Sequence, residues 1–322
     1  MNERTQELKI IEKGLMSDIL NKDKEFKNIK EHLAIKSMTN FTVSIGICAY
    51  NEEKNIGRLL DRLLKEKKLY TLKEIIVVAS GCTDGTEGIV KQYTSKCEKI
   101  NLIVERGRKG KASAINIILK EAVGDIIVFV DGDDLPAKNS ICKLIKPIEK
   151  NNVSATTGRM IPKKNGQKLI YFFNSLIWRL HHRVSLNQPK ISGQFFAIKR
   201  NLIKKIYSKA VCDDAFITGI LRGKNINIGY VPKAIVYIET PSNIIRLLKQ
   251  RKRIAIGYTQ LRLNGLDVTF SFDQKIKALI EEIIKSPRNV YKIILIVFLE
   301  IIANLLAFFD IVRGNIPYCW EK

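Results

Sequence analysis

The sequence has 322 residues, enough for one large domain or two of ordinary size. Hydrophobic residues make up 46% and charged residues 27%, a globular balance that excludes disordered, low-complexity and collagen-like chains. Lysine and arginine number 55 against 32 acidic residues, and the net charge of +23 favours anionic partners such as nucleotides, nucleic acids or an acidic membrane surface.

Residues 1–40 form the first predicted segment. Lysines alternate there with acidic residues, and leucine and isoleucine recur at helical spacing, which predicts one or two amphipathic helices. The opening residues are polar and do not read as a secretory signal. The six cysteines contain no CxxC pair, so neither a zinc ribbon nor a disulfide framework is expected. A reducing cytoplasm is the expected setting.

From Phe41 onward, short apolar runs alternate with helical patterns. Strands are expected at TVSIGICAY (42–50), KEIIVVAS (73–80), NLIVE (101–105) and DIIVFV (125–130). This alternation predicts an α/β fold whose mainly parallel sheet is covered by helices on both faces. Ligands bind at the carboxyl ends of such strands, where the polar tips AYNEE, SGCTDGT and DGDD fall.

The last segment, residues 241–322, changes to basic and apolar helical patterns. A basic stretch at 249–263 precedes an amphipathic helix expected at 275–285. The apolar run 290–312 exceeds the length of about 20 residues that crosses a membrane. It is interrupted by Glu300, Asn304 and Asp310. Three interpretations stay open for this run: a spanning or deeply inserted helix, an interfacial helix, and a buried core helix.

Three acids, Asp131, Asp133 and Asp134, directly follow the fourth expected strand. An ordinary strand-end turn also uses Asp and Gly, and that reading stays open. Three carboxylates within four residues repel one another unless a cation lies between them. Mg2+ is typically held by a few carboxylates together with substrate phosphates. The cluster therefore favours a metal–diphosphate site.

The sequence RGRKGKASAIN is similar to a phosphate-binding P-loop but fails that template. Glu105 stands where the first glycine belongs, and Ala112 stands where Ser or Thr follows the lysine. Gly110 and Lys111 remain at a helix start, where backbone amides and an ammonium group could face a phosphate.

Seven segments in order resemble the motifs of family 2 glycosyltransferases, which are inverting enzymes with the glycosyltransferase A fold. They are AYNEE, SGCTDGT, GKASAIN, FVDGDD, ISGQFFAIKR, CDDAFITGILRGKNINIGYVP and KQRKRIAIG, and they cover residues 41–257. The last segment resembles the QxxRW motif of polysaccharide synthases, with Ile254 at the tryptophan position. Within the family, the chain is most similar to membrane-associated polysaccharide or lipid-linked sugar transferases.

The resemblance implies a role for each matching residue. Asp133, with Asp131, would hold Mg2+ or Mn2+. The implied donor-binding residues are Ala49, Tyr50, Glu52, Asp84, Lys111, Asp131 and Gly193. Ala79 and Ser80 stand near the positions where the family often has two further acids, so the nucleobase stays open.

On the acceptor side, the resemblance implies that Asp214, preceded by Asp213, is the catalytic base. Inverting transfer needs a carboxylate that removes a proton from the acceptor hydroxyl, and a cation that stabilises the departing diphosphate. A helix N-cap is the alternative reading of this acid pair. The implied acceptor-binding residues are Gln250, Arg251 and Arg253.

The sequence therefore predicts a catalytic domain at 41–240, with a nucleotide-binding half at 41–134 and an acceptor half at 135–240, followed by membrane-associating helices at 241–322. The expected reaction is metal-assisted, inverting transfer from a nucleotide-diphospho-sugar, with UDP as the expected nucleotide. A lipid-linked or surface-polysaccharide acceptor is expected. Transfer of a single sugar is favoured over polymerisation, because at most one helix could span a membrane.

Two other functions share some of these features. A sugar nucleotidyltransferase would carry a glycine-rich, arginine-bearing loop after the first strand, and AYNEE is not such a loop. A nucleic-acid-binding protein fits the charge, but no helix-turn-helix or aromatic RNA-binding strand is recognisable, so no nucleic-acid partner is expected.

Charge placement gives an independent expectation about the acceptor. No acidic residue lies between Glu149 and Asp213, whereas thirteen basic residues do. An unrelieved basic segment between the two acid groups suggests an anionic acceptor and an active site that opens toward an anionic membrane surface. The chain would then work at the cytoplasmic face of the cell membrane, as a peripheral or single-span protein. A composition rich in Lys and Ile is the alternative explanation.

Overall fold

The computed structural model describes residues 41–66, 70–164, 166–266, 268, 270–316 and 318–319. The helices expected within residues 1–40 lie outside the described residues. The elements in chain order are β1 (Thr42–Ala49), α2 (Ile56–Lys65), β2 (Thr71–Ser80), α3 (Thr86–Thr94), β3 (Ile100–Glu105), α4 (Lys111–Glu121), β4 (Ile126–Asp131), β5 (Leu135–Pro136), α5 (Ser140–Glu149), β6 (Ala155–Pro162), α6 (Lys168–Ser185), β7 (Phe195–Lys199), α7 (Asp213–Gly223), β8 (Ile228–Ile238), α8 (Ile244–Leu263), α9 (Phe272–Lys285), η1 (Pro287–Asn289) and α10 (Val290–Val312).

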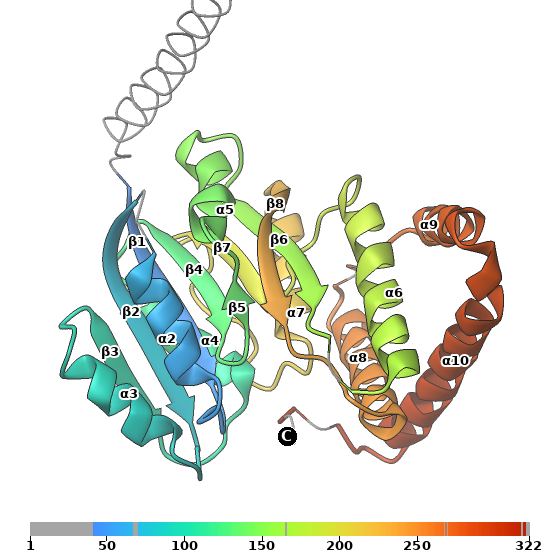
Figure 1. The fold of residues 1–322 in the computed structure, drawn as a ribbon, viewed down its shortest axis with the longest axis horizontal. Helices are drawn as coiled ribbons and strands as arrows, with labels where there is room; N and C mark the ends of the chain where they lie inside the picture. The colour runs from blue at the N-terminus through green and yellow to red at the C-terminus, as the bar shows by residue number, and fades with distance from the viewer. Residues whose placement is uncertain are drawn as a thin grey trace, which may run out of the picture.

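The strands of the described chain form a single sheet in the order β3-β2-β1-β4-β7-β6-β8-β5 (Figure 1). β1 to β4 are mutually parallel, as their short apolar runs separated by helices predicted. β7 runs antiparallel to both β4 and β6, and β6 pairs in parallel with β8. The result is a mixed α/β sheet whose parallel half carries the predicted nucleotide-binding loops.

Helices cover both faces of the sheet because successive strand residues point in opposite directions. Ile75 and Val77 of β2 belong to an apolar cluster with α2, α3 and α5, whereas Ile76 and Val78 belong to a cluster with α4 and α7. α4 lies directly on β1: a Cβ at Gly46 would be 2.4 Å from a methyl carbon of Ile118. This close packing fixes the start of α4, and with it Lys111, at the carboxyl edge of the sheet.

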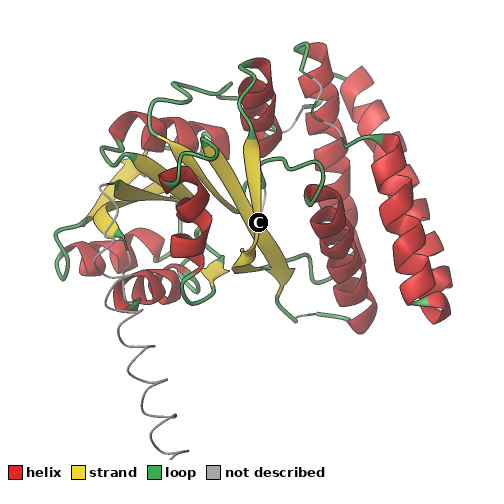
Figure 2. Cartoon of the chain, turned by 90° about the horizontal axis from the view of Figure 1, so that it is seen from above, coloured by secondary structure: helices red, strands yellow, loops and turns green. Residues whose placement is uncertain are grey.

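The C-terminal helices form a further unit beside the sheet (Figures 1 and 2). α6, α8 and α10 share an apolar cluster that includes Phe173, Leu247 and Ile293, and α9 packs against its edge through Leu279 and Ile283. α6 contacts β6, and α8 contacts α7, so this unit lies next to the half of the sheet that contains β6 and β8.

Candidate active site

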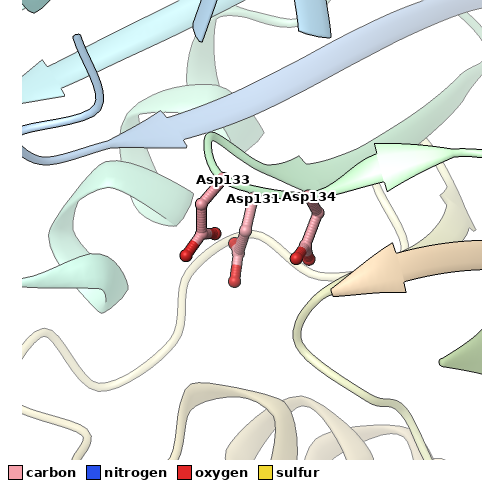
Figure 3. Close-up of side chains that lie close together, drawn as sticks. All are labelled: Asp131, Asp133 and Asp134. Carbon is pink, nitrogen blue, oxygen red and sulfur yellow. The ribbon is translucent and has the colours of Figure 1, made fainter. Parts of the chain in front are cut away.

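Three aspartates lie at the carboxyl end of β4, the strand between β1 and β7 (Figure 3). Asp131, Asp133 and Asp134 each place one carboxylate oxygen within 4.8 Å of the others. A hydrogen bond of 3.1 Å from Asp134 N to Asp131 O closes the turn, and one of 3.1 Å from Gly132 N to Cys48 O ties it to β1. A strand-end turn and a converging set of carboxylates are therefore both present.

This carboxylate set fits a divalent cation. Asp134 is 2% exposed, and its Oδ2 has no hydrogen-bond partner among the described residues. Burial raises the pKa of Asp131 to about 7, and the Asp133 carboxylate contributes to that rise. Burial and the same neighbours raise the pKa of Asp134. A cation between these oxygens would remove the repulsion, and Mg2+ and Mn2+ both prefer oxygen ligands.

Lys111 joins this cluster to a second pair of acids. It begins α4 after Gly110, whose φ of +88° lets the chain turn into the helix. Lys111 Nζ lies 2.7 Å from Asp131 Oδ2 and 3.7 Å from Asp213 Oδ2, and it donates to Gly193 O at 3.0 Å. Burial alone would lower the pKa of Lys111, but the two carboxylates outweigh it and raise that pKa.

The second acid pair lies in the first turn of α7. Cys212 is the N-cap of this helix, and Asp213 and Asp214 follow it in the first turn, where the helix dipole favours acidic side chains. Asp214 Oδ1 accepts a hydrogen bond from Ala215 N at 2.8 Å, and its Oδ2 accepts one from Gly193 N at 3.4 Å. Burial, followed by the charge of Asp213, raises the pKa of Asp214. A carboxylate with a raised pKa is a better acceptor of a proton near neutral pH.

Gly193 lies beside both Lys111 and the α7 acids. A Cβ at this position would lie 3.1 Å from Lys111 Nζ, 3.2 Å from Asp213 Oδ2 and 3.4 Å from Asp214 Cβ. Any larger residue would push the lysine or the acids apart. The structure therefore brings Lys111, Gly193 and both acid groups together, as one site at the carboxyl edge of the sheet.

The residues expected to bind the nucleoside lie in the loops after β1 and β2. Asp84 accepts hydrogen bonds from Glu53 N at 3.1 Å and from Thr86 N at 3.0 Å, so its carboxylate ties the two loops together. The guanidinium of Arg108 lies 3.6 Å from the centroid of the Tyr50 ring. Arg108 is not among the residues that the family resemblance implies, although it lies only three residues before Lys111.

Ala49 and Glu52 lie against the aspartate turn. A Cβ at Gly132 would be 3.0 Å from Glu52 Cγ and 3.4 Å from Ala49 Cβ. The Glu52 side chain is buried and accepts a hydrogen bond from Asn55 Nδ2 at 2.9 Å. The loop after β1 thus supports the turn that presents the metal-binding carboxylates.

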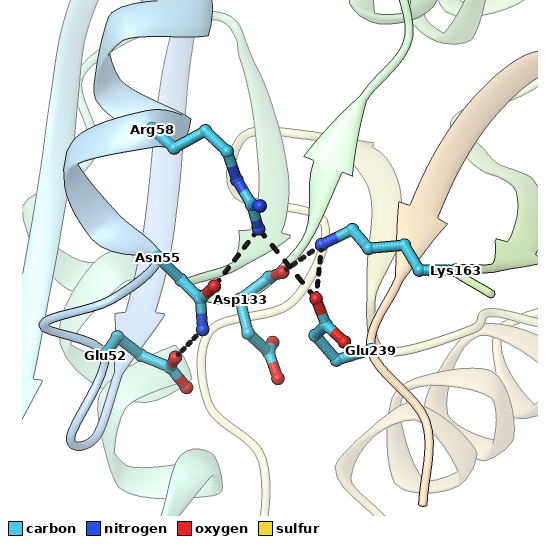
Figure 4. A network of polar contacts seen from close by, with 6 residues as sticks. All are labelled: Glu52, Asn55, Arg58, Asp133, Lys163 and Glu239. Carbon is cyan, nitrogen blue, oxygen red and sulfur yellow. Dashed lines mark hydrogen bonds and ion pairs between the residues drawn. The ribbon is translucent and has the colours of Figure 1, made fainter. Parts of the chain in front are cut away.

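A polar network braces this turn from the opposite side (Figure 4). Lys163, which follows β6, donates to the backbone oxygen of Asp133 at 3.1 Å and pairs with Glu239 at 2.9 Å. Arg58 lies 3.9 Å from the same Glu239 carboxylate and donates to Asn55 at 3.1 Å. No sequence motif contains Lys163 or Glu239, so the sequence did not predict that they support the aspartate turn. Lys163 is one of the thirteen basic residues between Glu149 and Asp213.

The expected acceptor residues lie on α8 and are Gln250, Arg251 and Arg253. Arg251 Nε is 2.5 Å from Glu300 Oε1, and Lys252 Nζ is 2.5 Å from Asp310 Oδ2. Two of the polar residues that interrupt the apolar run of α10 therefore pair with basic residues of α8. Arg251 is tied to a C-terminal helix, and its assignment to the acceptor stays a prediction.

Positive charge along residues 150–209 is partly neutralised in the fold. Arg179 pairs with Glu282 at 2.7 Å, and Arg183 pairs with Glu281 at 2.7 Å. Lys163 pairs with Glu239, as described above. Acids from segments that are distant in sequence therefore neutralise these three of the thirteen basic residues, and the anionic acceptor stays a prediction.

Lys163 offers a test of the metal site that does not depend on knowing the reaction. Lys163→Met should weaken Mn2+ binding by roughly 10- to 100-fold, the usual range for a residue that orients a metal ligand. Mn2+ binding is measured by electron paramagnetic resonance, with Asp133→Ala marking the full loss. Lys164→Met, at the exposed neighbouring lysine, is the matched control. Unchanged Mn2+ affinity in Lys163→Met would contradict the bracing role.

The chain is similar in sequence and in fold to known proteins. The chain matches the family description "Glycosyl transferase family 2" over residues 44–207 and "Glycosyl transferase family group 2" over residues 126–313. It is 27% identical over 250 residues to the Bacillus subtilis (strain 168) protein named "Probable glycosyltransferase YdaM", which covers 72% of this chain and 59% of that protein. The chain thus spans less than two thirds of that relative.

A second relative is the poly-beta-1,6-N-acetyl-D-glucosamine synthase of Staphylococcus epidermidis, 27% identical over 278 residues, with 83% of this chain and 67% of the synthase covered. Among solved structures, the mannosyltransferase PcManGT from Pyrobaculum calidifontis, in complex with GDP-Man and Mn2+, has a TM-score of 0.60 at 19% identity. That match covers 85% of this chain and 88% of the other, and it shows a shared fold. The chain has the glycosyltransferase A fold and belongs to glycosyl transferase family 2.

Proposed function

We propose that the protein transfers a sugar, with inversion, from a nucleotide-diphospho-sugar to a lipid-linked or surface-polysaccharide acceptor. The observation that carries this proposal is the pair of carboxylate groups bridged by Lys111. One group lies at the end of β4 and the other at the start of α7, with Lys111 Nζ at 2.7 Å from Asp131 and 3.7 Å from Asp213. Two neighbouring acid groups fit the two requirements of glycosyl transfer: a cation site for the departing diphosphate and a base for the acceptor hydroxyl.

The donor half of the site handles the leaving group. Asp131 and Asp133, with Asp134 beside them, would hold Mg2+ or Mn2+, which supplies positive charge against the diphosphate when bound. Lys111 adds a second cation near the same place. The loops that contain Tyr50 and Asp84 are proposed to receive the nucleoside, with UDP as the favoured nucleotide.

The acceptor half supplies the base. Asp214 takes the proton from the acceptor hydroxyl as its oxygen attacks the anomeric carbon from the face opposite the nucleotide. A new bond forms between that oxygen and the anomeric carbon, and the bond to the diphosphate breaks, leaving its electron pair on the nucleotide. Because Gly193 N donates to Asp214 Oδ2, the carboxylate is held in a fixed direction. Asp213 is a positioning residue, since it contacts Lys111.

Replacement of Asp214 should reduce sugar transfer but leave donor binding unchanged. Asp214→Asn keeps the shape of the side chain but cannot accept the acceptor proton, so turnover should fall by about 100-fold or more. Affinity for UDP in the presence of Mn2+, measured by calorimetry, should stay within about twofold, because the donor carboxylates are untouched. Asp213→Asn is the control and should lose less turnover. An equal collapse of donor affinity in Asp214→Asn would instead make Asp214 a donor ligand.

The pH dependence of turnover should report the same carboxylate. Burial and Asp213 raise the pKa of Asp214 from its ordinary 3.8, and a base works only when deprotonated. Turnover should therefore fall, as the pH is lowered, at a higher pH than for an ordinary aspartate. Asp213→Asn removes the neighbouring negative charge, so the acidic limb should move to lower pH. An acidic limb that stays in place in this variant would exclude Asp214 as the titrating base.

The C-terminal helices α9 and α10 are proposed to lie on a membrane surface. The apolar face of α9 and α10 is defined by exposed side chains of Ile276, Ile280, Ile284, Ile294, Phe298, Ile301, Leu305, Phe308 and Phe309. Pro287–Val312 is the one stretch of the described chain with the length and composition to cross a membrane, and its most apolar window is only 22% buried. That exposure does not support the core-helix interpretation.

The neighbourhood of α10 favours an interfacial position over a spanning one. One side of α10 packs along α8, whose first turns expose Arg246 and Lys249, and the acids Glu300 and Asp310 pair with α8. A helix with protein and charge on one side and apolar side chains on the other lies in the plane of the interface. Basic residues nearby favour an anionic, cytoplasmic leaflet. A peripheral protein of this kind suits transfer of a single sugar to a lipid-linked precursor.

Vesicle sedimentation of the full-length chain tests this placement. Phe298→Glu puts a charge in the middle of the apolar face, so binding to vesicles of phosphatidylcholine with phosphatidylglycerol should fall by roughly 10-fold or more, because a carboxylate replaces an apolar side chain that enters the interface. Val123→Glu is the matched control, because Val123 is also an exposed apolar residue and follows α4. Equal binding by both variants would contradict the membrane-facing surface.

A further inference from the structure

A half-buried lysine, Lys190, lies in the segment that contacts the proposed base. Lys190 lies between α6 and β7, and its ammonium donates a hydrogen bond to the hydroxyl of Tyr258 on α8. The same Nζ lies 4.2 Å from the centroid of the Phe270 ring and 4.9 Å from that of the Tyr258 ring. No carboxylate of the described chain lies within 4.0 Å of it.

The backbone next to Lys190 connects this lysine to the base. Ile191 N donates to Thr218 Oγ1 at 3.1 Å, and Thr218 Oγ1 donates in turn to Asp214 O at 2.8 Å. Two residues later, Gly193 N donates to Asp214 Oδ2 at 3.4 Å. The segment from Lys190 to Gly193 therefore runs across the start of α7, the helix that carries Asp214.

The electrostatic surroundings of Lys190 are unfavourable for a cation. Burial lowers the pKa of Lys190 to about 8, and the charges of Lys275 and Arg251 act in the same direction. Asp214 opposes this effect but is not close enough to form an ion pair. A half-buried ammonium that contacts no carboxylate is stabilised by a bound anion, because the anion supplies the opposite charge.

The anion that fits best is one that carries more than a single charge. The Lys190 ammonium contacts two aromatic rings and no acid of the described chain, and a phosphate monoester supplies a charge of about −1.5 to −2 at neutral pH. The ammonium uses one of its three protons on Tyr258, which leaves two for phosphate oxygens. The rings of Tyr258 and Phe270 offer flat apolar surfaces to the rest of such an acceptor.

We propose that Lys190, Tyr258 and Phe270 form the acceptor subsite, and that this subsite binds the phosphate group of a phosphorylated acceptor while its hydroxyl faces Asp214. The inference rests on the proposed glycosyl transfer and names the substrate class of the same site. The phosphate belongs either to a lipid carrier or to a soluble phosphate ester, and the chemistry recognised is the same.

The test measures phosphate binding directly, with UDP and Mn2+ already saturating so that the diphosphate positions are filled. One arm uses soluble sn-glycerol 3-phosphate, with glycerol as the uncharged counterpart, and the other uses a polyprenyl phosphate in phosphatidylcholine vesicles. Wild-type protein should bind at least one phosphate probe and should not bind glycerol. Binding only of the polyprenyl phosphate would identify a lipid carrier as the source, and binding of glycerol phosphate would identify a soluble ester.

Lys190→Met should weaken binding of that probe by roughly 10-fold or more, the value of a lost charge-assisted hydrogen bond. Lys190→Arg should restore part of the affinity. Tyr258→Phe, which keeps the ring and removes only the hydroxyl, should weaken binding less than Lys190→Met. Lys204→Met, at an exposed lysine of the same acid-free stretch, is the control and should bind like wild type.

The outcomes separate the inference from the proposed function. UDP affinity in the presence of Mn2+ should be the same in Lys190→Met and in wild type. If wild-type protein binds UDP but holds both phosphate probes no more tightly than Lys190→Met does, the acceptor subsite is overturned and the donor site stands. If wild-type protein binds no UDP in the presence of Mn2+, the proposed function fails, and the subsite fails with it.

Discussion

The contact of one ammonium with two groups of carboxylates organises the whole site. Lys111 lies between Asp131 of β4 and Asp213 of α7, although these acids are about eighty residues apart in sequence. Without a cation between them, buried carboxylates at this separation would repel one another. The lysine therefore sets the distance between the metal-binding turn and Asp214, and in the proposed reaction that distance determines whether donor and base act on the same sugar.

Close packing makes this contact possible. Gly46 lets α4 lie directly on β1, which carries Lys111 to the carboxyl edge of the sheet, and Gly193 leaves room for the lysine beside the α7 acids. The aspartate turn is braced on one side by Glu52 and on the other by Lys163. A metal-binding turn held from both sides keeps its carboxylates oriented, which is the role that second-layer residues play around metals.

The parallel half of the fold and the position of the site could be predicted because both are local properties of the sequence. The runs at β1 to β4 are short, apolar and separated by helices, and the acids follow β4 directly. The side-chain pairs that support the site depend on contacts between residues that are distant in sequence. No local pattern links Lys163 to Glu239, Arg179 to Glu282 or Lys190 to Tyr258. For the same reason, the acid-free stretch suggested unrelieved charge, whereas the fold neutralises part of it.

The most direct test of this account is a crystal structure of the protein with Mn2+ and UDP, in which the anomalous signal of manganese locates the metal. We expect a manganese peak bound by the carboxylates that follow β4, with the diphosphate on that ion and with Lys111 still in contact with Asp213. The Asp214 carboxylate should then face the open side of the diphosphate, where a sugar would lie. A manganese ion bound elsewhere, or UDP bound away from Lys111, would contradict the account.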